Sequence, residues 1–261
     1  MKENKLLIFF VVLIIVGGIV FVIWSGKKDS YKDASNEVKD KVNDRLDYYV
    51  NITKYYSSKF DGVDLLFEKD KFNKNDVSNA SLLRLATSYV NKELNNTISN
   101  NVINQLVNDE GLDKNVYTFY DGKLIRQAIK ELFDIDYKDQ GIVSENNFKY
   151  GYQYYKDYDV YVVSSNDNYV NNEDYQIDYK VLNIKENKDG DIKVEFVIAY
   201  VFIDNAHSSL KYSSKSDLSD LVYEVKIDDA GIKEEDKFTK FNIFLKKTDN
   251  GYVFDSLEKI K

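Results

Sequence analysis

The chain of 261 residues contains no cysteine and no proline, and it has a single histidine. Without cysteine, the chain cannot form disulfides, thiolate zinc sites, iron–sulfur clusters, a cysteine nucleophile or a cysteine-linked lipid anchor. His207 alone cannot provide a histidine metal cluster or an HExxH motif, and it falls in an expected loop over residues 205–216. These absences exclude a large part of enzyme chemistry.

Arginine is also scarce, because Arg45, Arg84 and Arg126 are the only arginines among 36 basic residues. Together with abundant Asn, Ile and Tyr, this composition is typical of an AT-rich genome and carries no functional information. The formal net charge of −8 disfavours nucleic acid and anionic lipid as ligands, because clustered Lys and Arg bind those partners.

Sequence motifs for phosphate, nucleotide and metal chemistry are missing as well. There is no GxSxG, GxxxxGK[ST] or GxGxxG sequence. An EF-hand template centred on Gly190 or Gly251 fails, because Lys falls where the first acidic ligand is needed. Acidic runs at 228–229 with 234–236, and at Asp167 with 173–174, have two interpretations, which are loops that hold Ca²⁺ loosely and solvated loops, and the second is favoured. We therefore predict no cofactor, no metal ion and no identifiable catalytic residue.

The first long feature is an apolar run from Leu6 to Trp24 without a charged side chain. As a helix it would be about 28 Å long, at about 1.5 Å per residue, which matches the hydrocarbon thickness of a bilayer. A cleaved signal peptide is the alternative, but the run exceeds a typical apolar region of about 7–15 residues and no cleavage site follows. We predict a single-pass anchor at 6–24, with the tail 1–5 in the cytoplasm and the rest of the chain outside the cell membrane.

Residues 25–62 are predicted to form a linker and a helical stalk. Apolar and aromatic side chains recur there at helical spacing: Val38, Val42, Leu46, Tyr49, Thr53, Tyr56 and Phe60. Two alternatives follow, which are a coiled coil that makes a homodimer through residues 38–60, and an amphipathic helix packed on its own domain. The second is favoured, because the pattern spans too few heptads to indicate a coiled coil.

Residues 63–147 are predicted to be mainly helical. Three amphipathic stripes occur at 82–94, 98–107 and 124–133. Ser78 or Ser81 is expected to cap the first helix, and the second is expected to end near Gly111. We interpret all three stripes as core positions.

Residues 148–261 change to the two-residue period of strands. Alternation begins near Phe148 and continues at 175–181, 192–203, 221–227 and 241–257. The strand at 192–203 is apolar on both faces, so it should be central and covered on both sides. Turns are expected at 187–190 and 250–251. The predicted fold is α+β, with the helical layer followed by a curved antiparallel sheet of about five to seven strands.

The ending FNIFLKKTDNGYVFDSLEKIK resembles the closing hairpin of cystatin-like and NTF2-like extracytoplasmic domains of Gram-positive membrane-anchored proteins. The resemblance extends over about 113 residues, from Lys149 to Lys261, and includes no diagnostic motif. It implies a concave sheet in a binding or assembly module, and no catalytic residue of such domains can be matched here.

Tyrosine is abundant, with 22 in the chain, and Tyr150, Tyr152 and Tyr154 alternate along one predicted strand. They are candidate binding residues, because tyrosine rings can stack on sugars or grip a peptide. The alternative is that they are half-buried strand residues. We predict a membrane-anchored envelope protein that binds a protein, peptide or wall polymer. An extracytoplasmic hydrolase with paired carboxylates stays open, because 44 acidic residues make such pairs common.

Overall fold

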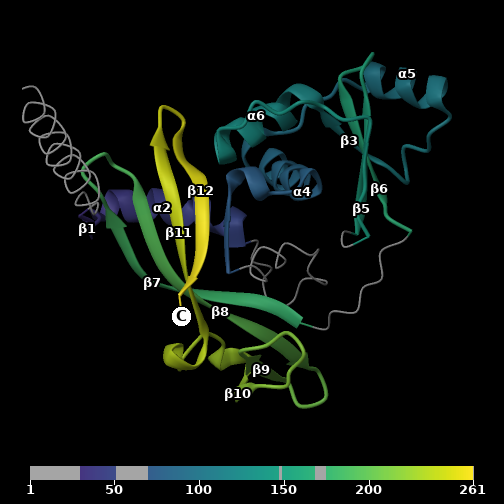
Figure 1. The fold of residues 1–261 in the computed structure, drawn as a ribbon. Helices are drawn as coiled ribbons and strands as arrows, with labels where there is room; N and C mark the ends of the chain where they lie inside the picture. The colour runs from purple at the N-terminus through teal and green to yellow at the C-terminus, as the bar shows by residue number, and fades with distance from the viewer. Residues whose placement is uncertain (1–29, 51–69, 147–148, 168–174, 261) are drawn as a thin grey trace, which may run out of the picture.

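The computed structural model describes residues 30–50, 70–146, 149–167 and 175–260 (Figure 1). The predicted anchor at 6–24, the stalk residues 51–62 and Phe148 lie outside this part of the chain. Within the described residues, no helix is both long and apolar enough to span a membrane. The fold combines helices with antiparallel sheets, as the sequence predicts.

The larger sheet is antiparallel and recruits strands from both ends of the described chain. Its strands are β1 (Lys32–Asp33), β2 (Lys71–Asn73), β7 (Tyr175–Glu186), β8 (Ile192–Asp204), β9 (Ser209–Ser213), β10 (Leu221–Lys226), β11 (Thr239–Thr248) and β12 (Gly251–Ile260). The main order is β1-β7-β8-β11-β12-β2, and β9 and β10 extend from the second half of β8. The short strands β1 and β2 therefore form the two edges of the main path.

Both predicted turns in this sheet are confirmed. Gly190 has a φ of 85°, and the Asn187 side chain accepts hydrogen bonds from the backbone N–H groups of Asp189 and Asp191 at 2.9 and 2.8 Å. Gly251 has a φ of 101° at the β11–β12 turn. Glycine suits both positions because side chains disfavour positive φ.

Strand β8 is central and buried on both faces, as predicted. On one face Phe196 and Ile198 join the core beneath the helices. On the other face Val197, Ala199 and Val201 pack in a separate cluster with β9 and the segment before β11. The expected loop at 205–216 is wrong in part, because β9 lies within it. Its five residues are too few, and too rich in Ser and Lys, to show a clear period.

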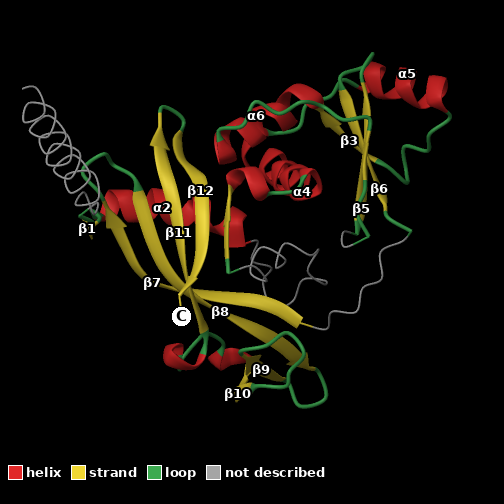
Figure 2. Ribbon diagram, viewed as in Figure 1, coloured by secondary structure: helices red, strands yellow, loops and turns green. Residues whose placement is uncertain are grey.

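The helices are α2 (Asn36–Val50), α4 (Asn79–Tyr89), the π-turn η2 (Val90–Leu94), α5 (Asn100–Glu110) and α6 (Gly122–Phe133), with short 3-10 turns η1 (Lys74–Asp76), η3 (Ile227–Asp229) and η4 (Glu235–Lys237). Helices α2, α4 and α6 join the main core on one face of the larger sheet, and α4 and α6 also contact the smaller sheet (Figures 1 and 2). Ser78 caps α4, Gly111 ends α5, and the Asp121 carboxylate caps α6. These helix boundaries agree with the sequence signals.

Helix α2 packs on its own domain along its described length. Val42, Leu46 and Tyr49 are buried in the main core. The described part of the predicted stalk helix therefore follows the second alternative. A homodimer through residues 38–60 stays a prediction, and within the described residues it would have to use other faces of the helix.

Tyr49 connects three elements through one buried hydroxyl group. It donates to the Leu132 carbonyl of α6 at 2.7 Å and accepts from the Phe254 N–H of β12 at 3.1 Å. The register of β11 and β12 shifts between Phe244 and Leu245, opposite the step from Ser256 to Phe254. Such a bulge leaves a strand N–H group in need of another acceptor, and the Tyr49 hydroxyl supplies it.

The smaller sheet contains β3 (Thr118–Asp121), β4 (Ile142–Val143), β5 (Tyr150–Tyr155) and β6 (Val160–Ser165), in the order β3-β6-β5-β4. Helix α5 covers its outer face. This corrects the expectation of one sheet beginning near Phe148, because the strands at 150–165 pair with β3 and β4 instead of β7–β12. Strand β3 has only four residues, and β6 begins with the unbroken apolar run VYVV. The sequence pattern of neither strand therefore indicates which strand it pairs with.

We predict that Tyr49→Phe lowers the free energy of unfolding by about 2 kcal/mol, because it leaves a buried N–H and a buried carbonyl without their shared partner. Tyr179→Phe is the matched control, since its hydroxyl donates to an exposed carboxylate, that of Asp47. Urea denaturation measures both values. Equal losses in the two variants would contradict the role of the buried hydroxyl.

Candidate functional site

A cavity of about 540 Å³ lies between α4, η2 and the inner face of the smaller sheet. We call it the tyrosine cavity. Its lining combines aromatic rings, hydroxyl groups, an amide and two cationic side chains, from Arg84, Thr87, Ser88, Asn91, Lys92, Thr118, Tyr120, Tyr150, Tyr152 and Val163.

The strand wall of the cavity follows from the alternation of β5. Tyr150 and Tyr152 are two residues apart, so they project from the same face of the sheet. Tyr152 pairs with Val163 of β6, which pairs with Thr118 of β3 on its other side. Tyr152 is buried, whereas Tyr150 is half-buried, with the Lys149 ammonium 5.3 Å from its ring centroid.

The helical wall comes from α4 and its continuation as a π-turn. Arg84, Thr87 and Ser88 have the spacing of three and four that places side chains on one helix face. The π-turn then brings Asn91 and Lys92 to the same cavity. The Asn91 amide donates to the Tyr120 hydroxyl at 2.8 Å and so fastens this turn to β3.

The charged side chains that line the tyrosine cavity, among the described residues, are cationic. Arg84 and Lys92 contribute two cations, and no carboxylate is found among the lining residues that the structure describes. Lys149 adds a third cation next to Tyr150. In a chain with a net charge of −8, this local excess of positive charge is favourable for an anionic group. The hydroxyl and amide groups around it are suited to hydrogen bonds with a polar ligand.

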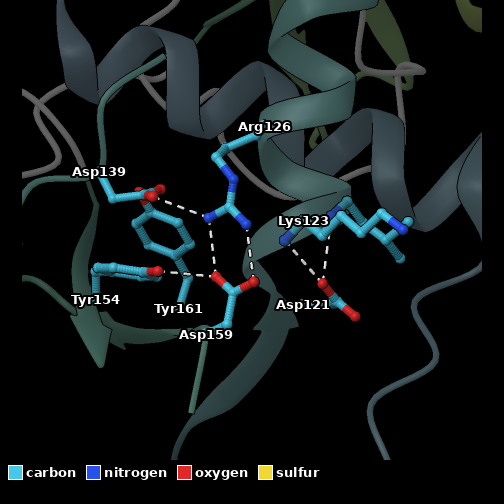
Figure 3. Close-up of polar contacts among 8 residues, drawn as sticks. Asp121, Lys123, Arg126, Asp139, Tyr154, Asp159 and Tyr161 are labelled. Carbon is cyan, nitrogen blue, oxygen red and sulfur yellow. Dashed lines mark hydrogen bonds and ion pairs between the residues drawn. The ribbon is translucent and has the colours of Figure 1, made fainter. Parts of the chain in front are cut away.

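A polar clamp next to the cavity holds the smaller sheet against α6 (Figure 3). Arg126 of α6 makes a two-point contact with Asp159, from Nη1 to Oδ1 and from Nη2 to Oδ2, both at 2.8 Å. Its Nη1 also donates to Asp139 at 2.9 Å. Tyr154 donates to Asp159 at 2.8 Å, and Tyr161 donates to Asp139 at 2.6 Å. Each carboxylate in this clamp is thus shared by a guanidinium and a tyrosine.

The protonation states in the clamp are those of a structural ion pair. Arg126 holds the pKa of the Asp159 carboxyl below its usual value, and hydrogen bonding to Asp159 raises the pKa of the Arg126 guanidinium. Burial, followed by the hydrogen bond to Asp159, raises the pKa of Tyr154 to about 12, so its hydroxyl stays protonated and donates. A general acid needs a carboxyl with a raised pKa. Asp159 therefore gives no support to the hydrolase alternative.

The clamp also requires a glycine at the start of α6. The Gly122 N–H donates to the Asp159 carbonyl at 2.7 Å, and a Cβ on Gly122 would lie 2.2 Å from the Asp159 Oδ1 and 2.8 Å from that carbonyl oxygen. Asp159 itself has a φ of 51°, which Asp adopts more readily than most residues. The β5–β6 hairpin is thereby fixed on α6, and with it the strand wall of the tyrosine cavity.

The structure separates the three tyrosines that the sequence singled out. Tyr150 and Tyr152 line the cavity, whereas Tyr154 belongs to the clamp and packs against Tyr161 with ring centroids 4.9 Å apart. Sequence reasoning missed Arg84 and Lys92, because they lie on the polar side of an amphipathic stripe that was interpreted only as core. The rarity of arginine was the one signal that could have drawn attention to Arg84.

His207 and the acidic residues at 228–236 show no metal site, whereas residues 173–174 lie outside the part of the chain that the structure describes. His207 is exposed in the turn before β9, with its Nδ1 3.0 Å from an Asp204 oxygen. Over the residues that the structure describes, no three His, Cys, Asp or Glu side chains are grouped so as to hold a metal ion. Comparison of the chain with family models, curated proteins and solved structures gives no match. The resemblance to cystatin-like and NTF2-like domains therefore stays a prediction.

We predict that Asp159→Asn lowers the free energy of unfolding by about 1–2 kcal/mol at neutral pH, because it removes the charge that faces Arg126 while tolerating the positive φ. Asp157→Asn is the control, since Asp157 is an exposed carboxylate in the same hairpin. Chemical denaturation gives both values. A loss as large for Asp157→Asn would show that the clamp adds nothing specific.

The clamp also predicts a pH dependence. Because the folded pKa of Asp159 is lowered, its contribution is complete above the unfolded value of about 3.9 and is lost as the pH falls through the folded pKa. The stability difference between the wild type and Asp159→Asn should therefore be largest near neutral pH and should shrink below about pH 4. Denaturation curves between pH 3 and 7 measure it, and a difference that grows on acidification would contradict the assignment.

Proposed function

We propose that the chain is a membrane-tethered binding protein of the cell envelope, whose tyrosine cavity takes an anionic, hydroxyl-rich wall polymer. The observation that supports this proposal is that tyrosine rings, hydroxyl groups and two cations line one cavity, without a carboxylate among its described lining residues. Rings can stack on sugar rings, and Arg and Lys can pair with anionic substituents.

The location rests on the sequence. The apolar run at 6–24 is long enough for an anchor, and it would hold the binding domain close to the membrane surface. The net charge of −8 for the whole chain would repel an anionic polymer from most of the surface and would leave the cationic cavity as the attractive region. Binding of this kind should weaken as the salt concentration rises.

The test is a binding titration of the full chain in detergent micelles with a purified anionic wall polymer. We predict that Tyr150→Ala lowers the affinity at least about fivefold, because it removes a ring from the cavity wall. Tyr155→Ala is the matched control, since Tyr155 lies on the same strand but packs on the opposite face, under α5. Thermal unfolding of both variants checks that each is folded.

Two further comparisons in the same titration test the chemistry. The polymer stripped of its anionic groups should bind more weakly than the intact polymer, and added salt should reduce the binding of the intact polymer. Equal affinities for wild type and Tyr150→Ala, or equal affinities for the intact and stripped polymers, would contradict the proposal.

A further inference from the structure

A second cavity of about 490 Å³ lies between α2, the π-turn η2 and the β11–β12 turn. We call it the Arg45 cavity. Its lining mixes charged side chains with three tyrosine rings, from Lys41, Asp44, Arg45, Tyr48, Tyr89, Lys92, Glu93, Gly251 and Tyr252. Lys92 lines both cavities, so they lie on either side of the π-turn.

Arg45 is the unusual residue in this cavity. Its guanidinium has no ion-pair partner within the described part of the chain, and Nη1 is buried without a hydrogen-bond acceptor. Nη2 makes a long hydrogen bond, 3.4 Å, to the Asn250 carbonyl, and the guanidinium also interacts with the Tyr89 hydroxyl. The guanidinium carbon lies 5.3 Å from the centroid of the Tyr89 ring. A buried donor without an acceptor is costly, so a half-buried arginine in this condition indicates a missing acceptor.

The contrast with Arg126 supports this interpretation. Arg126 meets two carboxylates through three hydrogen bonds of 2.8–2.9 Å, whereas Arg45 meets none in the described residues. Both are half-buried residues on helices in the same core. The fork of a guanidinium matches a carboxylate in two points.

The neighbouring charges restrict the ligand. Lys41 is paired with Glu37 at 2.8 Å, and the Lys92 ammonium lies 5.1 Å from the Tyr48 ring centroid. Glu93 accepts from the Tyr48 hydroxyl at 2.6 Å, and Asp44 is a second carboxylate in the lining. Two carboxylates in the lining would repel a dianion such as a phosphate monoester more than a singly charged carboxylate.

The rings supply a surface for an apolar body. Tyr48 and Tyr89 meet edge to face with centroids 5.0 Å apart, and Tyr252 forms a further part of the wall. Burial, followed by hydrogen bonds to glutamates, raises the pKa of both Tyr48 and Tyr89, so both hydroxyls stay neutral. An aromatic or aliphatic group can pack against these rings while its carboxylate points to Arg45.

We propose that the Arg45 cavity is a second binding site, which takes a small organic acid with one carboxylate and an apolar body, and that Arg45 binds the carboxylate. This site is independent of the tyrosine cavity, because it rests on a different arginine and different rings. The two sites share only the Lys92 side chain.

The scarcity of arginine makes a direct experiment practical. In the full chain in micelles, labelled with ¹⁵N-arginine, only three arginine side chains give Nε–Hε signals, and Arg→Lys variants assign them. Benzoate is the probe, and benzamide is its neutral control of the same shape. We expect a saturable shift of the Arg45 signal with benzoate, no such shift with benzamide, and little change at Arg126.

Three results would overturn the proposal. They are equal Arg45 shifts with benzoate and benzamide, the same shift with sodium chloride at equal ionic strength, and tighter binding of phenyl phosphate than of benzoate. Calorimetry gives a second measurement, in which Arg45→Lys should lower benzoate affinity at least fivefold, whereas Asp157→Asn, an exposed substitution outside both cavities, should change it less than twofold. The Arg84 signal reports on the tyrosine cavity, so the failure of one site is distinguishable from the failure of the other.

Discussion

The buried hydroxyl group of Tyr49 is the contact on which the placement of the helices depends. It joins α2 to the last turn of α6 and to the bulged part of β12, and its ring also packs against Phe133 and Phe254. Because Arg45 lies one turn earlier on the same helix, this contact also sets where Arg45 meets the β11–β12 turn. A single side chain thus fixes the core and one cavity wall together.

Helix α6 connects the main core to the smaller sheet. Its buried face contacts α4 and β12, while Arg126 near its start holds the β5–β6 hairpin. The three arginines consequently have three different environments. Arg126 pairs with two carboxylates, Arg84 lines the tyrosine cavity, and Arg45 lines the second cavity without a carboxylate hydrogen-bonded to it among the described residues. Lysine could not replace Arg126 with the same geometry, because the planar fork makes two parallel bonds to one carboxylate.

Local signals in the sequence predicted local structure well. Ser78, Gly111 and Gly251 mark boundaries because caps and tight turns depend on nearby atoms alone. The two-faced apolar pattern of 192–203 likewise identified β8 as central. Strand pairing was not predictable in the same way, since β3 and β9 are short and their partners lie far away in the sequence. The cavities were missed for a related reason, because Arg84, Lys92 and Tyr150 come together only after two distant segments pack.

The order of strands in the larger sheet has a consequence for the timing of folding during synthesis. Its edges come from early residues, since Lys32 of β1 pairs with Glu186 and Phe72 of β2 pairs with Leu257. Contacts between residues so far apart form slowly, because a long loop must close before they form. Helices such as α4 and α6 can form as soon as they are made, but β2 has no partner until β12 has been synthesised. The pairing of β2 with β12 is therefore among the last contacts of the larger sheet to form.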